Sequence, residues 1–386
     1  MAFHGPKAPE KEELTSAIEL AERVFRSGAG TTMVQEFPLL FGRNNAENLR
    51  VFTDKGQVIS LVGMFVRDAW LLGTRHRCCC IGAVCTDSAC RGKGLATRLM
   101  EDARRKAVAD GVDIFFISGG RGLYRRLGYV DAGTYFTCGV KRTKLPRKGT
   151  YAFRPWELED LPALVRIHSA EPVRFDRTPE DFLAFLMTGR VQCSTGTTAV
   201  VCPSAGHEPV AYFSYQIGGP PWERKDKDSV TVVEMGGPRY AIFRAFGALL
   251  DRQGVDTAQV RFLGSDAEMT ELARSFGWRS QSQGFPGTVG VIEPARLWQA
   301  CVPLFAERLG RERAARLKIA VGEQVKISYG REKVVLHGMG AFTELVFGPH
   351  QRRDELDLGL RRGSELARVL DDVLPLPLVD YGLNYV

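Results

Sequence analysis

The residues best placed to do chemistry form one short stretch, Arg91-Gly92-Lys93-Gly94-Leu95-Ala96. It follows an apolar segment that predicts a strand, Cys80 to Thr86, and precedes a segment with helical spacing, Leu95 to Ala109. Two glycines within three residues let the backbone curl, so that amides of the turn and of the first helical residues point at one spot. Free N–H groups and the helix dipole favour an anion there, and Arg91 and Lys93 add positive charge. The stretch therefore predicts a diphosphate-binding loop.

Two common diphosphate loops do not fit this stretch. A Walker A loop requires a glycine where Asp87 stands, and it requires a Ser or Thr directly after the lysine, where Gly94 stands. A dinucleotide fingerprint requires a third glycine, where Thr97 stands, and a later acidic residue at the end of a strand. Asp113 is at about the right distance, but it opens the next predicted strand instead of ending it. Both readings are therefore weak.

A third pattern, Arg/Gln-x-x-Gly-x-Gly/Ala, is fully matched by Arg91, Gly94 and Ala96. It is the pyrophosphate loop of the Gcn5-related N-acetyltransferases (GNAT), which bind acetyl-coenzyme A, and the chain resembles this family in two further blocks. Ile81 to Thr86 looks like the family's central strand, and Gly119 to Tyr129 looks like its last conserved block. The resemblance implies an α+β fold in which a mixed, mostly antiparallel sheet is flanked by helices.

The resemblance also implies which residues hold the coenzyme and which one acts on it. The pantetheine would pair with the central strand and the pyrophosphate with the loop, so the implied cofactor-binding residues are Val84, Cys85, Thr86, Arg91, Gly92, Lys93, Gly94, Leu95, Ala96 and Thr97. Tyr124 matches the family's general acid. A phenol with a pKa near 10 stays protonated at neutral pH and can give its proton to a leaving thiolate.

The chain of 386 residues is too long for one ordinary domain. We expect a catalytic GNAT domain at residues 1–146, a degenerate second copy at 147–290 and a smaller α+β domain at 291–386. In the second copy, Gly236-Gly237-Pro238-Arg239 stands where the loop should be. Aligning Gly277 on Gly128 puts Ala273 opposite the tyrosine, so we expect this copy to be catalytically silent.

Tandem copies, a smaller third domain and an apolar, aromatic end, Pro375 to Val386, together resemble the enhanced intracellular survival (Eis) branch of the superfamily. This resemblance implies a sterol-carrier-like third domain with a buried C-terminus, and a homo-oligomer, either a trimer or a hexamer. It also implies that the terminal carboxylate, here that of Val386, serves as general base. Glu36, Asp68 and Asp131 are other possible bases, and the sequence does not choose among them.

The nine cysteines include three consecutive ones, Cys78 to Cys80, and form no Cys-x-x-Cys pair. We expect reduced, mostly buried thiols and no metal site. Cys85 and Cys90 flank the loop, and an acetyl-cysteine route would require a paired base. No adjacent histidine suggests such a base, so direct transfer is the preferred hypothesis.

The composition limits the class of protein. A net charge of +7, with 44% hydrophobic and 25% charged residues, is typical of a soluble globular protein. The sequence contains no basic tract interleaved with aromatic residues, the pattern that would suggest nucleic-acid binding. No apolar run approaches the length of a membrane span, and residues 1–13 lack a hydrophobic signal core. We therefore expect a cytoplasmic protein without a nucleic-acid or membrane partner.

The leading hypothesis is an acetyl-coenzyme A-dependent N-acetyltransferase that acts directly on a primary amine in a ternary complex. The acceptor could be a small molecule, such as an aminoglycoside or a polyamine, or the amine of a peptide or lysine. The alternative is a non-catalytic acyl-coenzyme A-binding or scaffold protein, and a weaker one is a lipid carrier that uses the third domain. The acceptor is not written in the loop; Phe37 to Phe41 could form one wall of its pocket.

Overall fold

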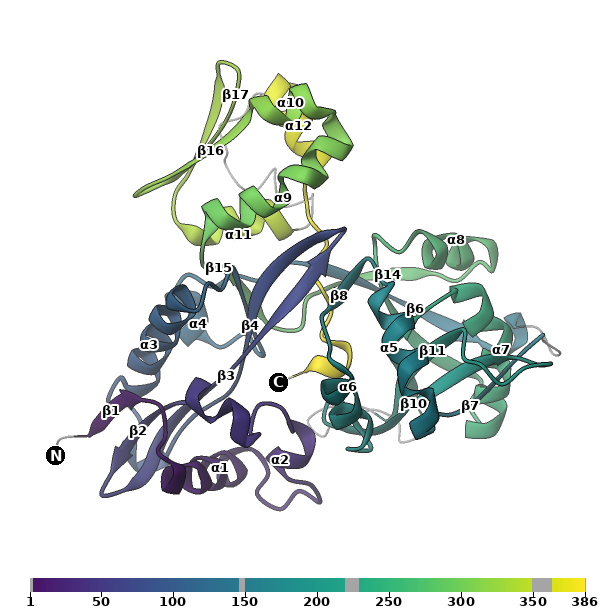
Figure 1. Ribbon diagram of the computed structural model, residues 1–386, viewed down its shortest axis with the longest axis horizontal. Coiled ribbons are helices and arrows are strands. Elements are labelled where there is room, and N and C mark those ends of the chain that lie inside the picture. The colour runs from purple at the N-terminus through teal and green to yellow at the C-terminus, as the bar shows by residue number, and fades with distance from the viewer. Residues whose placement is uncertain (1–2, 146–149, 219–228, 349–362, 386) are drawn as a thin grey trace.

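The computed structural model describes residues 3–145, 150–218, 229–348 and 363–385. Figure 1 shows a body built on the N-terminal strands, a second body beside it in teal, and a smaller one in green above. The last residues, in yellow, descend from the third body into the space between the first two. Three separate sheets underlie these bodies, which confirms the predicted α+β class with two sheet domains and a smaller C-terminal one.

The first sheet carries the candidate coenzyme loop and has the strand order β1-β2-β3-β4-β5-β15, with β8 also paired to β3. Only β4 and β5 run parallel; the other neighbours are antiparallel. Its strands are β1 (His4–Lys7), β2 (Arg50–Asp54), β3 (Gln57–Leu71), β4 (Thr74–Thr86), β5 (Ile114–Ile117), β8 (Val173–Phe175) and β15 (Thr288–Val291). The sheet is thus mixed and mostly antiparallel, as predicted.

The long β3–β4 hairpin differs from what its local sequence suggests. A charged pair such as Arg67-Asp68 is typical of a break between two strands, but β3 runs through both residues and turns only at Leu72 and Gly73. The backbone there is left-handed, with φ of +52° and +85°. Asp68 is accommodated within the strand because its carboxylate pairs across the hairpin with Arg75, at 2.5 Å.

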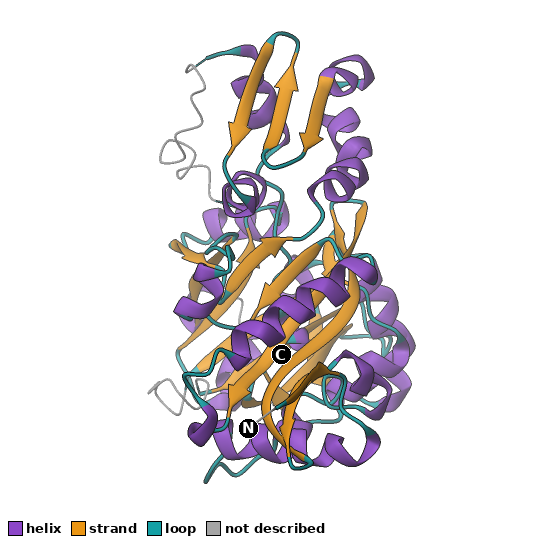
Figure 2. Ribbon diagram, turned by 90° about the vertical axis from the view of Figure 1, so that its left-hand side faces the viewer, coloured by secondary structure: helices purple, strands orange, loops and turns teal. Residues whose placement is uncertain are grey.

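Helices cover both faces of this sheet (Figure 2). The helix α3 (Leu95–Ala109) buries the predicted stripe of Leu95, Leu99, Ala103 and Ala107 against one face. The helix α1 (Lys11–Phe25) packs on the other face. Because side chains alternate along a strand, Cys79 faces the α3 side, whereas Cys78 and Cys80 face the α1 side.

The second sheet has the order β14-β6-β13-β12-β11-β10-β7, and β9 pairs with β10. Its strands are β6 (Thr134–Lys141), β7 (Tyr151–Pro155), β9 (Arg190–Val191), β10 (Ser194–Pro203), β11 (Ala211–Ile217), β12 (Val230–Gly236), β13 (Thr257–Leu263) and β14 (Ser280–Gly284). The helices are α5 (Leu161–Ser169), α6 (Pro179–Leu186), α7 (Arg239–Gln253) and α8 (Ala267–Ser275). Among the described strands of this sheet, the one parallel pair is again central, between β12 and β13.

The two sheets exchange strands across the expected domain limits. β6 precedes residue 147 but pairs with β13 of the second sheet. β8 lies within residues 147–290 and β15 straddles residue 290, but they pair with β3 and β5 of the first sheet. The domain boundaries at residues 146 and 290 remain a prediction. The hydrogen bonds of the sheets join strands from both sides of these boundaries.

The third body contains an antiparallel sheet of β16 (Leu317–Val321), β17 (Val325–Tyr329) and β18 (Glu332–Leu336). Its helices are α9 (Pro294–Leu309), α10 (Arg311–Arg316), α11 (Met339–Phe347) and α12 (Glu365–Val373). The helix α9 packs against β4 of the first sheet, so the two bodies share one apolar core. The architecture agrees with the smaller α+β domain predicted for this region.

The segment after α12, residues 374–385, is hereafter called the tail. It is largely buried, as its apolar sequence predicted: Leu374, Leu376, Leu378, Val379, Tyr381 and Leu383 are each less than 9% exposed. The short helix η6 (Gly382–Asn384) lies near its end. The tail ends between the first two bodies, close to α6 in Figure 1. Val386, the predicted base, lies outside the described residues.

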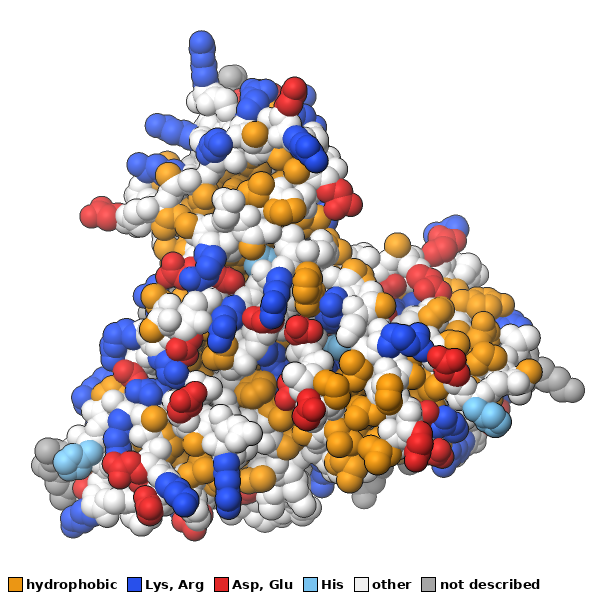
Figure 3. All heavy atoms as spheres, viewed as in Figure 1, with side chains coloured by type: hydrophobic (Ala, Val, Ile, Leu, Met, Phe, Trp, Pro, Cys, Tyr) orange, Lys and Arg blue, Asp and Glu red, His pale blue; other side chains and the backbone are white. Residues whose placement is uncertain are grey.

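The surface carries both signs of charge. On the face seen in Figure 3, Lys and Arg side chains are interspersed with Asp and Glu. Within the described residues, no helix is both long enough and apolar enough to cross a membrane. All nine cysteines are free thiols, and eight of them are buried.

Candidate active site

The glycine-rich loop lies between β4 and α3 and is exposed at each residue from Arg91 to Gly94. Gly92 and Gly94 have φ of +76° and +72°, a backbone conformation that side chains other than glycine's rarely adopt. Gly94 is the N-cap of α3, and among the described residues no side chain caps that helix. The amides of Leu95, Ala96 and Thr97 therefore remain free to bind an anion at the positive end of the helix.

Two cations stand on the same loop. The Arg91 guanidinium donates from Nε to the Thr86 carbonyl at 3.3 Å, which holds it over the end of β4. The Lys93 ammonium lies 5.0 Å from the centre of the Phe3 ring, a cation–π distance. The backbone amides and these two side chains form the donor set that a diphosphate requires, so the residues present fit the phosphate groups of a coenzyme A.

The central strand diverges from its parallel neighbour beside this loop. β4 pairs with β5 only from Cys78 to Ile81, and β5 ends at Ile117, whereas β4 continues to Thr86. A bulge follows at once, because Leu61 faces Cys85 while Gly63 faces Gly82, and Ala83 has a φ of +51°. Bulges recur beside active sites because they re-aim the backbone. The split leaves the edge of Val84 to Thr86 open toward β5.

Tyr124 lies near this split, on the short helix α4 (Gly122–Arg126). Its side chain is only 2% exposed and belongs to the apolar cluster that contains Ile81, Val84 and Ile117. Burial raises the pKa of its phenol, and Arg121 only partly offsets that rise. The hydroxyl is therefore protonated at neutral pH and can act as a proton donor. Arg121 also donates to the Val84 carbonyl at 3.2 Å, which ties α4 to the open edge of β4.

Comparisons with known proteins now bear on this geometry. Residues 6–131 match the family model described as an acetyltransferase (GNAT) domain. That segment contains the split strand, the loop and Tyr124. We call residues 6–131 the acetyltransferase domain, after the family model that they match. No curated protein sequence matches the chain.

Solved structures extend the likeness in fold to the whole chain. A probable N-acyltransferase from Enterococcus faecalis is 14% identical, with a TM-score of 0.64 and 98% of each chain covered. A GCN5-related N-acetyltransferase from Kribbella flavida has the same identity and TM-score over the full length of both chains. Eis1 from Mycobacterium abscessus is 13% identical, with a TM-score of 0.61 over 98% of this chain and 99% of that one. These folds agree with the predicted tandem GNAT architecture of the Eis type. The family match over residues 6–131 supports an acyltransferase.

The two cysteines near the loop of the acetyltransferase domain differ in exposure. Cys85 is buried, which raises the pKa of its thiol to about 12. A thiol is a weak nucleophile until it is ionised, so Cys85 is a poor acetyl carrier at neutral pH. Cys90 is partly exposed at the end of the short helix η2 (Ser88–Cys90).

The three side-chain carboxylates considered as bases are each held by an arginine. Glu36, at the end of α2 (Met33–Glu36), is buried and accepts from Arg26 Nε at 2.8 Å. Asp68 pairs with Arg75, and Asp131 accepts from Arg125 at 2.7 Å. Each of these carboxylates is therefore already engaged by a cation of the chain itself.

The tail brings the end of the chain to this domain. The ring of Tyr381 packs edge-on against Phe116 of β5, with centroids 6.4 Å apart, and Phe116 is paired with Cys80 of β4. Further on, the Tyr385 ring lies 6.3 Å from that of Phe37. The segment from Phe37 to Phe41 thus packs against the tail, through the Phe37 ring and that of Tyr385, the last described residue.

The corresponding loop of the second copy is occupied by the chain's own carboxylates. Arg239, at the start of α7, donates from Nη1 and Nη2 to Glu171 at 3.0 and 2.6 Å, and from Nε to Asp266 at 2.8 Å. Glu171 also accepts the backbone N–H of Gly237 at 2.8 Å. The anion site of this copy is therefore filled from within. Ala273, opposite Tyr124 in the alignment, is a buried residue of α8.

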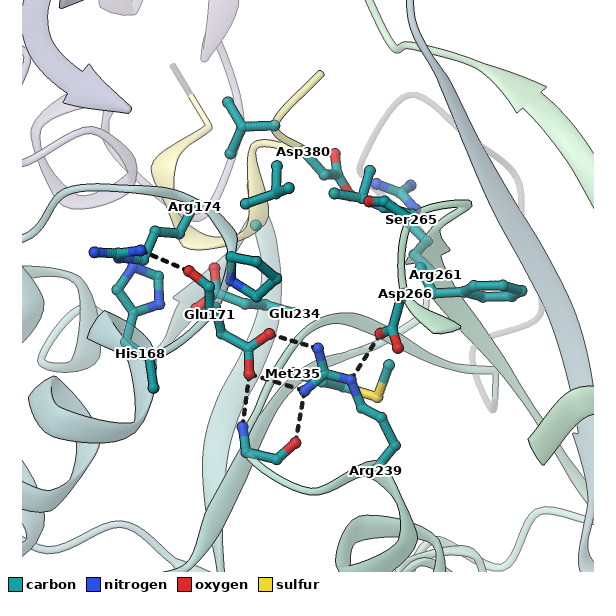
Figure 4. Close-up of a pocket in the computed structure, with 18 of the residues that line it drawn as sticks. His168, Glu171, Arg174, Glu234, Met235, Arg239, Arg261, Ser265, Asp266 and Asp380 are labelled. Atoms are coloured by element: carbon teal, nitrogen blue, oxygen red, sulfur yellow. Dashed lines mark hydrogen bonds and ion pairs between the residues drawn. The ribbon is translucent and has the colours of Figure 1, made fainter. Parts of the chain in front are cut away.

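Beyond these carboxylates, a cavity of 460 Å³ lies between the ends of β12 and β13 and the tail (Figure 4). Asp380 of the tail and Arg261 of β13 lie close together in its wall, and Val379 and Gly382 complete the tail's part of that wall. No sequence motif indicates this cavity, because its walls come from segments that are distant along the chain.

Proposed function

We propose that this protein transfers the acetyl group of acetyl-coenzyme A directly to a primary amine. The observation that carries the proposal is the placement of Tyr124. Its buried, protonated phenol lies beside the open edge of β4, and the exposed anion loop follows the end of the same strand. A loop alone would serve a binding protein equally well, but a protonated donor beside the split strand is useful only if a leaving group must be protonated.

Each part of the acetyltransferase domain then has one task. The amides from Gly92 to Thr97, with Arg91 and Lys93, bind the pyrophosphate, and the backbone of Val84 to Thr86 pairs with the pantetheine. Acetyl-coenzyme A supplies the activated acetyl thioester. As the amine nitrogen bonds to the carbonyl carbon and the C–S bond breaks, Tyr124 gives its proton to the departing sulfur.

The amine must lose a proton before or during attack, and we assign this to the terminal carboxylate of Val386. The burial of the tail and the contact of Tyr385 with Phe37 support this assignment. The arginine partners of Glu36, Asp68 and Asp131 support it indirectly, because those carboxylates are already engaged in ion pairs. The raised pKa of Cys85 likewise favours direct transfer over an acetyl-cysteine route.

The remaining assignments belong to the same proposal. The acceptor is a primary amine of a small molecule, such as an aminoglycoside or a polyamine, or of a peptide. The chain works in the cytoplasm as a homo-oligomer, a trimer or a hexamer, which is the state that the Eis resemblance implies. The domains divide at residues 146 and 290, and only the first of them turns over acetyl-coenzyme A.

The proposal is tested by following release of free coenzyme A thiol from acetyl-coenzyme A in the presence of single amines. The panel contains polyamines, aminoglycosides, amino acids and peptides, and mass spectrometry identifies any acetylated product. Amine-dependent thiol release with an N-acetylated product is the expected result. Tight binding of coenzyme A with no product from any amine would instead favour the non-catalytic acyl-coenzyme A-binding protein.

A further inference from the structure

The split of the second sheet, unlike that of the first, holds a part of the chain itself. β12 pairs with β13 from Val230 to Val232, and Glu234 lies two residues beyond the last pair. In the first sheet the last paired residue of β4 is Ile81, and Ala83 lies two residues beyond it, at the bulge beside the open edge. Glu234 therefore occupies in the second copy the strand position that Ala83 holds in the first.

Glu234 uses its whole carboxylate to join the tail to the second sheet. Arg177 donates to both oxygens, at 2.7 and 2.6 Å, and Tyr212 adds its hydroxyl at 2.8 Å. The fourth donor is the backbone N–H of Leu383, at 2.9 Å. Burial alone would raise the pKa of Glu234, but Arg177 outweighs it and lowers that pKa to about 2. The carboxylate is therefore ionised throughout the physiological range.

Arg177 makes a second bond to the tail from the same guanidinium. Its Nε donates to the Asn384 side-chain oxygen at 2.7 Å, while its two terminal nitrogens hold Glu234. Only 1% of the Arg177 side chain is exposed. Gln192 contributes a further bond, from Nε2 to the carbonyl of Gly382 at 3.1 Å. Three successive residues of the tail, 382 to 384, are thus each bonded to a side chain of the second copy.

The close approach also explains the glycine at this point. Gly382 has a φ of +52°, and a Cβ there would collide with the carboxylate of Glu234. On either side of these three residues, Tyr381 packs on Phe116 of the first sheet and Tyr385 packs on Phe37. The tail is held by the second copy while its flanking rings rest on the acetyltransferase domain.

We propose that Arg177 and Glu234 are positioning residues, which we call the tail clamp: they fix residues 382–384 so that the chain terminus reaches the acetyl-transfer site. The clamp gives the catalytically silent copy a role in the reaction. This inference rests on the proposed function, because only that function gives the terminus a task. A buried ion pair adds little to stability compared with apolar packing, so a specific geometric role accounts for its presence better than stability does.

The first test measures whether the tail is held. Carboxypeptidase digestion of the full chain is followed by mass spectrometry, which records the rate at which residues 386 and 385 are removed. Arg177→Met and Gly382→Ala each disturb the clamp, and Asn384→Ala removes one bond while the Arg177–Glu234 pair stays intact. The matched control is Arg154→Met, because Arg154 makes an equally bidentate pair with Asp160 in the same body, at 2.6 and 2.8 Å, away from the tail.

The second test measures amine acetylation by the same proteins. Loss of a hydrogen bond to a charged group is worth roughly tenfold or more, so trimming should speed up and kcat should fall by about that factor in Arg177→Met and Gly382→Ala. Asn384→Ala should show a smaller change in the same direction. KM for acetyl-coenzyme A should stay within about twofold of the wild-type value, since the clamp does not touch the coenzyme loop.

The outcomes separate the two claims. Trimming rates that match wild type in all three variants would overturn the clamp. Faster trimming with an unchanged kcat would overturn its role in positioning the terminus, and so would an equal fall of kcat in Arg154→Met. A wild-type protein that acetylates no amine would overturn the proposed function, while the trimming rates would still decide whether the clamp holds the tail.

Discussion

The two copies differ in what fills the space at the end of the parallel strand pair. In the first, the loop at the start of α3 is exposed, two glycines keep it open, and two cations stand beside it. In the second, the loop at the start of α7 is closed by Glu171 and Asp266, and Glu234 binds the tail in the split. One unit presents free donors to a ligand, and the other has satisfied its donors internally.

This difference supports the proposal that only the first copy turns over acetyl-coenzyme A. The strand–loop–helix framework survives in both copies, because it depends on apolar packing and on a regular sheet. The anion site depends on a few donors that must remain unpaired, and internal carboxylates can pair with them at any stage. The second copy has kept the framework and turned its charges inward.

The largest expected effect comes from removing the Tyr124 hydroxyl, a group that the second copy lacks because Ala273 stands there. Tyr124→Phe removes the proton donor but keeps the ring, so kcat should fall by about 10²–10⁴-fold, the contribution of a general acid. The dissociation constant of acetyl-coenzyme A should stay near the wild-type value, as isothermal titration calorimetry can show. Tyr129→Phe is the control, because Tyr129 is also buried in the same apolar cluster. Equal losses in both variants would argue against a special role for Tyr124.

A somewhat smaller effect is expected from shortening the tail. Removing Tyr385 and Val386 takes away the proposed base but leaves the bonds of residues 382–384 to the second copy. We expect kcat to fall by about 10²-fold, at the lower end of the range for acid–base catalysis, with little change in coenzyme affinity. Steady-state kinetics with a saturating amine provide the measurement. Unchanged turnover would exclude the terminal carboxylate as the base.

Breaking the closed loop of the second copy should affect stability. Glu171→Gln removes the charge from a partner of Arg239 whose side chain is only 15% exposed, and loss of a charge-assisted hydrogen bond costs about 2 kcal/mol. The urea midpoint of unfolding should fall accordingly. Glu208→Gln is the matched control, because Glu208 pairs with Arg166 at the surface and its loss should cost about 0.5 kcal/mol or less. If the two variants unfold alike, the loop is not held closed by this pair.

The smallest effect concerns acid stability of the clamp's surroundings. His168 contacts Tyr212 and the Phe175 carbonyl, and burial followed by the nearby Arg177 lowers its pKa to about 3. Below pH 6.5, His168 takes up a proton in the unfolded chain but stays neutral in the folded one. This difference lowers the free energy of unfolding by about 1.4 kcal/mol for each pH unit. Above pH 6.5 its contribution is constant. Unfolding free energies at pH 7.5 and 5.5 should therefore differ less in His168→Asn than in wild type, and equal differences would contradict the assignment.

Local patterns in the sequence predicted the local parts of this molecule well. The stripe of α3, the strand before the loop and the burial of the apolar tail follow from periodicity and composition, and the structure bears them out. The charged pair Arg67-Asp68 is typical of a turn but lies inside a strand, because the carboxylate of Asp68 finds an ion-pair partner on the neighbouring strand. Pairings over long separations could not be predicted: Arg177 meets Glu234 from 57 positions away and Asn384 from 207. The exchange of β6 and β15 between sheets is of the same kind.

The most direct measurement is a calorimetric titration of acetyl-coenzyme A into the full chain and two glycine variants. Gly94→Val places a branched side chain at a φ of +72°, at a strain of about 1–2 kcal/mol, in the open loop. Gly254→Val imposes a similar strain at a φ of +66°, at the end of α7 in the second copy. The account predicts one coenzyme per chain in wild type, binding weakened by about tenfold or more in Gly94→Val, and wild-type binding in Gly254→Val. Two coenzymes per chain, or full affinity in Gly94→Val, would contradict it.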